Sequence, residues 1–413
     1  MQLAISGHSG PEGDPIVDPH FSPPIPTMRH PIQRTGKCHW LAGVLLYAGM
    51  TASHAAEPLQ PETLTVRPMP PRGDHAIYAL EMDNPLDTRV VVYDIDKKKL
   101  IAQKGAGFMP GVARSGDYRY TYVATSYFSR GTTGERTDVL EITDNASFRK
   151  VGEVVLPSKH AQQVPSLFNT TVSDDGGFAY VTNITPATSV TVVDLNGRKV
   201  AGEVDTAACV LTYPAGKNRF ASLCQSGKAL IVSLDKDGKE TTREQSAPFI
   251  DVENDPVFTH AARWGDGYLF LTFSGKVTPA DFSVSPARFD APWQIVTPQD
   301  AKQGWRPGGL QPFAASEKAG RLYVAMHQGG EGSHKEPATE IWVFDMASHA
   351  RVARWKLTGA KLLPMLTLSV SEGDRPLVFG STYHGVQAFD AMTGQLVHAD
   401  AKIGKAIVQM FPF

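Results

Sequence analysis

The sequence predicts an all-β protein, specifically a seven-bladed β-propeller of four-stranded antiparallel blades. No long stretch shows the 3.6-residue apolar period of an amphipathic helix, and short β-branched and aromatic runs recur instead. These runs come in pairs that repeat along the chain. A repeat of about 40–50 residues built from paired strands is typical of propeller blades, which bury their faces by packing against each other in a ring.

One run of each pair alternates apolar residues and ends in an aspartate. These runs are VVVYD to Asp94, VLEITD to Asp144, VTVVD to Asp194, LIVSLD to Asp235, VTPAD to Asp281, IWVFD to Asp345 and VQAFD to Asp390. A partner run precedes each of them. The partners are AIYAL, YTYVA, FAYVT, RFASL, YLFLT, LYVAM and LVFGS. Each pair predicts a β-hairpin, and the aspartate suits the turn that follows.

The widest spacing between these aspartates, from Asp281 to Asp345, contains DAPWQIVTPQDAKQGWRPGG. We interpret this segment as an insertion in a loop on one face of the propeller. A β-sandwich or a pair of β domains is the alternative fold. Sandwiches do not usually repeat one pattern seven times, which favours the propeller.

The N-terminal region has the organisation of an export signal. Three basic residues precede the apolar run CHWLAGVLLYAGM at 38–50, which is too short to span a bilayer. Small residues in the following TASHAAEP predict cleavage near Ala55/Ala56 and a periplasmic protein. A membrane anchor is the alternative.

These features divide the chain into a leader with a cleaved signal, 1–55, and a single propeller domain, 56–413. Translation starts at Met1 or Met28, since the first 27 residues precede the basic segment. The net charge of the whole chain is −2, which indicates neither a nucleic-acid surface nor a polybasic membrane patch. Two cysteines remain after processing, Cys209 and Cys224. An even number in an exported protein suggests one disulfide, and two free thiols are the alternative.

The stretch HQGGEGSHKEPATEIWVFD, His327–Asp345, is the most chemically dense part of the chain. His327 and His334 lack the ligand set of a zinc site, and GGEGSHK is not a phosphate-binding loop. No serine or cysteine nucleophile motif occurs either. We therefore predict no catalytic, cofactor-binding or metal residue in this chain. The stretch itself predicts the long turn and the second strand of a hairpin.

Several segments resemble the large (heavy) subunit of periplasmic quinoprotein amine dehydrogenases, from residue 74 to the C-terminus. They are GERTDVLEI (134–142), PATSVTVVDL (186–195), NDPVF (254–258), WRPGG (305–309), LYVAMHQGGEGSHKEPATEIWVFD (322–345) and RVAR (351–354), together with the cysteine pair. The short motifs PATS, ADFS and SHKEP are closer to the aromatic amine branch than to the methylamine branch.

The resemblance implies a two-plus-two heterotetramer with a small, cysteine-rich subunit. That small subunit would carry the tryptophan tryptophylquinone cofactor and the catalytic base. The complex would oxidise a primary amine to an aldehyde and ammonia, then pass electrons to a small copper protein or a cytochrome. The two mature cysteines of this chain agree with its being the other subunit, since they cannot supply the dense disulfides of the small one.

The resemblance also implies a role for one residue of this chain. GAGFMPGV resembles the family segment that places a phenylalanine at the mouth of the substrate channel, which makes Phe108 the candidate. A core aromatic is the alternative for Phe108. For the whole protein, the alternative function is a non-enzymatic exported propeller that acts as a binding or scaffold module.

Overall fold

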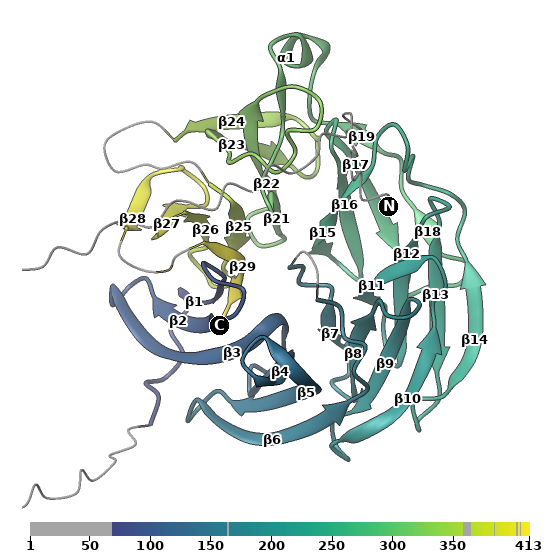
Figure 1. Cartoon of the computed structure of the whole chain (residues 1–413). Helices are drawn as coiled ribbons and strands as arrows, with labels where there is room; N and C mark the ends of the chain where they lie inside the picture. Colours follow the sequence, from purple (N-terminus) through teal and green to yellow (C-terminus); the bar gives the residue numbers. More distant parts are fainter. Residues whose placement is uncertain (1–67, 163–164, 358–364, 384, 402–403, 405) are drawn as a thin grey trace, which may run out of the picture. The chain divides into compact units, whose positions relative to one another are not determined.

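The computed structural model describes residues 68–413, apart from 163–164, 358–364, 384, 402–403 and 405. The predicted leader, its cleavage site and the start of the predicted domain therefore lie outside the described residues. In the described part, antiparallel β-sheets dominate and α1 (Pro298–Lys302) is the only α-helix (Figure 1). The prediction of an all-β fold is confirmed. No helix in the described part is long and apolar enough to cross a membrane.

The largest sheet has seven strands in the order β29-β1-β2-β3-β4-β5-β6. Its strands are β1 (Ala76–Glu81), β2 (Thr88–Asp94), β3 (Lys99–Arg114), β4 (Tyr120–Arg130), β5 (Thr133–Asp144), β6 (Arg149–Leu156) and β29 (Ile407–Pro412). The C-terminal strand thus pairs with the first strand of the chain. One sheet therefore combines strands that are far apart in the sequence.

Three further sheets have four strands each. The first contains β7 (Thr170–Val172), β8 (Phe178–Asn183), β9 (Ser189–Asp194) and β10 (Lys199–Asp205). The second contains β11 (Cys209–Pro214), β12 (Arg219–Cys224), β13 (Ala229–Leu234) and β14 (Glu240–Gln245). The third contains β25 (Thr367–Val370), β26 (Leu377–Thr382), β27 (Gly385–Asp390) and β28 (Leu396–Asp400).

The two remaining sheets have five strands each, because short strands of the predicted insertion join them. One contains β15 (Val257–Trp264), β16 (Gly267–Thr272), β17 (Lys276–Asp281), β18 (Arg288–Phe289) and β19 (Trp293–Gln294). The other contains β20 (Trp305–Pro307), β21 (Phe313–Ser316), β22 (Arg321–Gln328), β23 (Glu340–Asp345) and β24 (Arg351–Lys356). Helix α1 lies between β19 and β20 in sequence.

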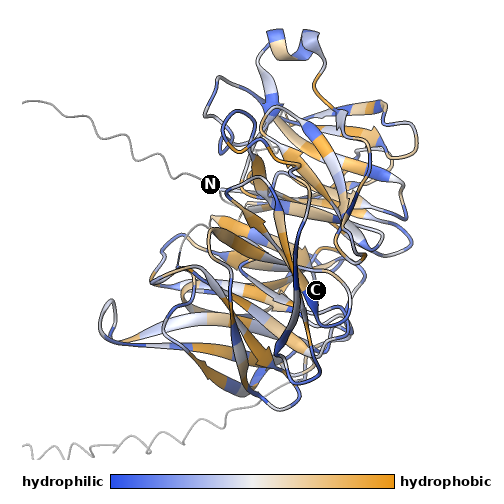
Figure 2. Cartoon of the chain, turned by 90° about the vertical axis from the view of Figure 1, so that its right-hand side faces the viewer, coloured by the Kyte–Doolittle hydropathy of each residue, from blue (hydrophilic) through white to orange (hydrophobic). Residues whose placement is uncertain are grey.

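All seven predicted hairpins form as antiparallel pairs. They are β1–β2, β4–β5, β8–β9, β12–β13, β16–β17, β22–β23 and β26–β27. Their strands are buried on both faces, whereas outer strands such as β14 (ETTREQ) expose most residues. Polar, exposed outer strands protect sheet edges from pairing with other chains. Figure 2 shows hydrophobic residues along many strands and hydrophilic ones at many turns.

The repeating aspartates are explained by the turns that follow them. Each carboxylate accepts a hydrogen bond from a backbone N–H two to four residues later. The donors are Lys97, Ser147, Asn196 and Gly197, Asp237 and Lys239, Ser283, Ala347 and Ser348, and Met392 and Thr393. An aspartate that bonds its own downstream backbone in this way forms an Asx-turn. The aspartate therefore fixes the entry into the outer strand of each unit.

Strand β3 serves two groups of strands. Its first half pairs with β2 as far as Gly107, and its second half pairs with β4 from Phe108 onward. Between the two halves the backbone has positive φ at Gly107 (73°) and Met109 (48°), and the β3–β4 register shifts between Phe108 and Gly111. A bulge of this kind bends and twists a strand. The seven-stranded sheet therefore consists of two four-stranded groups that share β3.

Among the described residues, seven apolar clusters join successive groups of strands. One joins β1–β2 to β4, and the next join β4–β6 to β8–β9 and β8–β10 to β12–β13. Others join β11–β13 to β15–β17, β15–β17 to β20–β23, and β21–β23 to β25–β27. The last cluster joins β26–β27 back to β1–β2. Each group of strands thus buries one face against its predecessor and the other face against its successor.

One cavity of about 350 Å³ is lined by residues of eight strands: β3, β7, β11, β15, β16, β21, β25 and β29. Its wall combines small apolar residues, among them five alanines and three valines, with polar, charged and aromatic side chains. Two of these polar groups are occupied by the backbone of neighbouring strands. The Gln311 amide donates to the carbonyls of Leu368 (2.6 Å) and Met410 (2.8 Å), and His260 Nε2 lies 2.8 Å from the Phe313 carbonyl. These side chains connect strands around the cavity.

Candidate functional site

Phe108 lies where β3 passes from one group of strands to the next. The Phe108 side chain is half-buried, and its ring meets Phe128 of β4 edge to face, with centroids 5.7 Å apart and an interplanar angle of 83°. The Thr125 hydroxyl donates to the Phe108 carbonyl at 3.3 Å. A half-buried aromatic pair at a strand junction differs from the core position that was the alternative. The channel-mouth role stays a prediction.

A buried polar network lies next to this aromatic pair. The Asp138 carboxylate is fully buried and accepts hydrogen bonds from the Ser126 hydroxyl (2.6 Å) and from the Arg136 guanidinium (2.7 and 2.6 Å). It also accepts from the backbone N–H of His160 at 3.0 Å. Arg136 donates in turn to the His160 carbonyl at 3.1 Å. The carboxylate thus ties the β4–β5 hairpin to the segment that leads toward β7.

The His160 imidazole is part of the same network and is almost completely buried. Burial lowers the pKa of His160 to about 4, while the Asp138 carboxylate opposes that shift and Arg136 adds to it. The ring is therefore neutral near pH 7. Ser126, Asp138 and His160 are residue types found in hydrolase triads, but here the serine hydroxyl bonds the aspartate at 2.6 Å. The Ser126 Oγ lies 3.4 Å from His160 Nδ1, so the arrangement is that of a buried anchor.

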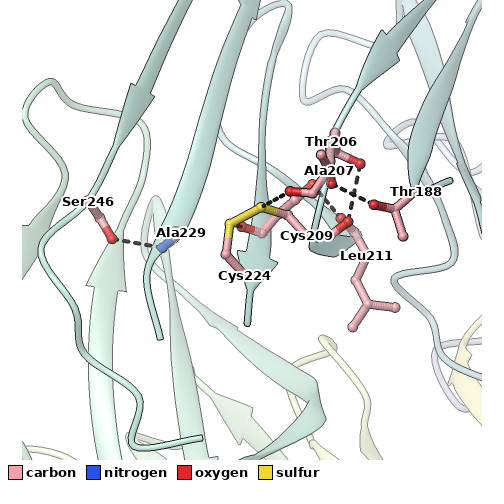
Figure 3. The surroundings of a disulfide bond; sticks show 9 residues. Thr188, Thr206, Ala207, Cys209, Leu211, Cys224, Ala229 and Ser246 are labelled. Carbon is pink, nitrogen blue, oxygen red and sulfur yellow. Dashed lines mark hydrogen bonds between the residues drawn. A yellow bond between two sulfur atoms is a disulfide. The ribbon is translucent and has the colours of Figure 1, made fainter. Parts of the chain in front are cut away.

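The predicted disulfide is present between Cys209 and Cys224. The two residues are directly opposite each other in the β11–β12 ladder, and both side chains are buried. Figure 3 shows the bond beside the turn before β11, where the Thr206 hydroxyl donates to the Cys209 carbonyl at 3.2 Å. The alternative of two free thiols does not apply.

The stretch from His327 to Asp345 forms the end of β22, a long turn and β23, as predicted. His327 Nε2 lies 2.9 Å from the Ser333 hydroxyl, and the His334 ring stacks on Phe273 with centroids 4.0 Å apart. Burial lowers the pKa of both histidines. No group of three His, Cys, Asp or Glu in the described part of the chain is placed to hold a metal ion.

Two tryptophans of this chain, Trp305 and Trp342, pack with ring centroids 5.4 Å apart. Both are buried, and the Arg354 guanidinium carbon lies 4.7 and 4.8 Å from their ring centroids. The Trp342 indole N–H donates to Glu340 at 2.8 Å, and Arg354 donates to the same carboxylate at 2.7 Å. Arginine over buried indole rings is a packing arrangement.

Sequence reasoning missed the network of Ser126, Arg136, Asp138 and His160. The available signal was the alternation of Arg136 and Asp138 in GERTDVLEI, which places two charges on one face of a strand. Their burial depends on His160, which is 22 residues beyond Asp138 and meets it only in the folded chain.

Comparison with known proteins identifies relatives over most of the chain. A family model described as methylamine dehydrogenase heavy chain matches residues 79–410. The methylamine dehydrogenase heavy chain of Methylophilus methylotrophus is 25% identical over 364 residues, covering 86% of this chain and 87% of that protein. The corresponding protein of Paracoccus versutus is 26% identical over 326 residues, covering 77% and 74%.

Similar solved structures share the fold at low sequence identity. A Bacteroides uniformis protein described as a candidate 6-phosphogluconolactonase has a TM-score of 0.55 and 11% identity, covering 81% of this chain and 98% of its own. A dihydro-heme d1 dehydrogenase has a TM-score of 0.54 and 13% identity, covering 84% and 78%. The match to the family model, by contrast, is a match in sequence, and it runs from β1 to β29. The chain therefore belongs to the methylamine dehydrogenase heavy chain family.

Proposed function

We propose that this chain is the large subunit of an exported, periplasmic amine dehydrogenase that oxidatively deaminates primary amines to aldehyde and ammonia. The observation that carries the proposal is the family match over residues 79–410, together with relatives matched over up to 87% of their own length. The likeness to heavy chains therefore extends over nearly the whole of those proteins. The likeness is therefore not limited to one group of strands.

The reaction chemistry is proposed to lie in a separate small subunit, which carries the tryptophan tryptophylquinone and the catalytic base. The quinone supplies the electron-accepting chemistry, and electrons leave through a small copper protein or a cytochrome. In this chain the Trp305–Trp342 pair is enclosed by Arg354 and Glu340, which supports a packing role for it. The contribution of this chain is then to hold the small subunit and to line the substrate channel at Phe108.

The architecture proposed for this role is a closed ring of seven blades. The seven apolar clusters, the last of which returns from β26–β27 to β1–β2, support the ring. So does the cavity, to which one strand or more of each group contributes residues. The sharing of β3 between two four-stranded groups supplies the seventh blade. A ring of this kind offers a rigid face on which two copies could each hold one small subunit in a two-plus-two heterotetramer.

Purification of the affinity-tagged chain from its native host tests this function. We expect a smaller, cysteine-rich chain to co-purify, with visible quinone absorbance and amine-dependent reduction of an artificial electron acceptor. The same preparation assayed with methylamine and with 2-phenylethylamine distinguishes the methylamine from the aromatic amine branch. A tagged chain that purifies alone and turns over neither amine would instead support a non-enzymatic binding or scaffold module.

A further inference from the structure

Phe108 does not stand alone at its position in the sheet. In the β3–β4 ladder Phe108 is directly opposite Ser126, and in the β4–β5 ladder Ser126 is opposite Asp138 and Phe128 is opposite Arg136. Residues directly opposite each other in a ladder share a face, as do residues two apart in one strand. All five side chains therefore lie on one face. The two half-buried aromatic rings and the buried ionic network are parts of one surface.

The β4–β5 hairpin extends beyond the rest of its sheet. The ladder between β5 and β6 begins at Asp138, opposite Leu156, whereas β4 and β5 remain paired out to Arg130 and Thr133. Phe128 thus belongs to a two-stranded extension, and isolated two-stranded ribbons are only marginally stable. Asp138 stands where this extension leaves the sheet.

The Asp138 carboxylate is well suited to hold that extension in place. It is fully buried, and its oxygens accept from Ser126, from two nitrogens of Arg136 and from the backbone of His160. A bidentate pair between a guanidinium and a carboxylate fixes orientation as well as distance. Because Arg136 is opposite Phe128, fixing Arg136 also fixes the strand pair that carries the Phe128 ring.

We propose that Phe108 and Phe128 form a two-ring gate for the amine substrate, and that Asp138 is the positioning residue that holds the gate. Phe128 is then a second specificity-determining residue, and its edge-to-face contact with Phe108 makes the two rings act together. The inference rests on the proposed function, because it requires that Phe108 lies on the substrate path.

The test uses the complete dehydrogenase complex and compares kcat/KM for 2-phenylethylamine with kcat/KM for methylamine. Phe108→Ala and Phe128→Ala should each raise this ratio at least fivefold, since a smaller side chain widens the gate for the bulkier amine. The double variant should give less than the product of the two single effects, because contacting residues are coupled. Asp138→Asn should move the ratio in the same direction through KM more than through kcat.

Glu340→Gln is the matched control for Asp138→Asn. Glu340, the first residue of β23, is also a buried carboxylate. It lies opposite Lys356, the last residue of β24, and accepts a hydrogen bond from Arg354. Glu340→Gln should lower the melting temperature without changing the ratio of kcat/KM for the two amines. Arg136→Lys keeps one charged contact but loses the bidentate pair, so it should shift the ratio in the same direction as Asp138→Asn and by less. If Asp138→Asn does not fold, Ser126→Ala, which removes one contact, takes its place.

The outcomes separate the two levels of the proposal. A wild-type complex that oxidises no amine overturns the proposed function and the gate with it. An active complex in which Phe108→Ala changes the ratio but Phe128→Ala does not overturns the two-ring gate alone. If Asp138→Asn, or Ser126→Ala in its place, changes only the melting temperature, as Glu340→Gln should, the positioning role of Asp138 is overturned.

Discussion

At the scale of single residues, burial keeps the imidazole of His260 uncharged, and this residue of β15 lines the cavity of about 350 Å³. Its Nε2–H donates to the Phe313 carbonyl at 2.8 Å, and the ring packs edge-on to Phe313 with centroids 4.9 Å apart. Burial lowers the pKa of His260 from 6.5 to about 4, and the hydrogen bond to the carbonyl only partly opposes that shift. The imidazole therefore stays neutral in the folded protein at pH values where it would be charged in the unfolded chain.

This difference predicts a pH dependence of stability. Between about pH 6.5 and 4 the unfolded chain binds a proton at His260 that the folded chain does not bind, so the free energy of unfolding falls as the pH falls. His260→Gln, whose amide can still donate to the carbonyl, should lose this share of the dependence. Urea unfolding at pH 7, 6, 5 and 4 should give a shallower slope for the variant. Equal slopes would contradict the assignment.

The roles and conformations of single residues were the hardest to predict from the sequence. Phe108 was identified only through resemblance, because nothing in GAGFMPGV says that the strand bends there. The positive φ at Gly107 could be anticipated, since glycine tolerates that backbone conformation, but the positive φ at Met109 could not. Phe128 gave no signal at all. Its ring meets Phe108 only in the folded chain, where β3 and β4 pair.

At the scale of elements, the Asx-turns explain why the hairpins could be predicted. Alternating apolar residues marked each strand, and the aspartate marked its end. The inner and outer strands could not be found in the same way. The inner strand β7 has three residues, and outer strands such as β14 and β24 are largely polar. Short or exposed strands carry too little hydrophobic pattern to be recognised, and they form because a neighbouring hairpin provides the ladder.

Replacing one of these aspartates should show how much such a turn contributes. The Asp194 carboxylate accepts from the backbone of Asn196 at 3.0 Å and of Gly197 at 2.9 Å. Asp194→Ala should destabilise the protein by about 1–2 kcal/mol, as expected when a side chain that caps backbone donors is lost. Asp194→Asn keeps an acceptor oxygen and should cost clearly less. Chemical denaturation measures both, and equal losses for the two variants would argue against the turn hydrogen bonds as the cause.

The disulfide stabilises one ladder, β11–β12, by closing a loop between residues 15 positions apart. Cys209→Ser should lower the free energy of unfolding by about 2–5 kcal/mol, mainly because the unfolded chain gains freedom. The wild-type protein unfolded with and without a reductant provides the control, since reduction should reproduce the loss in the wild type and leave the variant unchanged. A wild-type unfolding midpoint that does not respond to reduction would contradict this contribution.

At the scale of the whole molecule, the fold distributes its core among seven clusters between neighbouring groups of strands. The repeat in the sequence predicted this arrangement, because a sheet buried on both faces needs a neighbour on each side. What the repeat could not indicate is that β3 would run as one 16-residue strand through two groups. Nor could it indicate that the last group packs on the first with the help of β29, which is far from β1 in sequence.

The same scale carries the central functional claim, a division of labour between two chains. The candidate features of this chain are a half-buried aromatic pair, a buried ionic anchor, a disulfide and a cavity bounded by hydrogen-bonded strands. The aromatic pair, the ionic anchor and the disulfide hold neighbouring strands together. The long loop from His327 to Asp345, which is rich in histidine, glycine and charge, forms a hairpin turn in which His334 stacks on Phe273.

The most direct test separates the two chains of the purified complex under denaturing conditions and measures the intact mass and the quinone staining of each. We predict that this chain has the mass of its processed sequence less two hydrogens for the disulfide, without quinone staining, and that the smaller chain stains. Refolded together, the chains should regain amine oxidation that neither shows alone. Quinone staining or added oxygen mass on this chain, or amine oxidation by this chain alone, would contradict the division of labour.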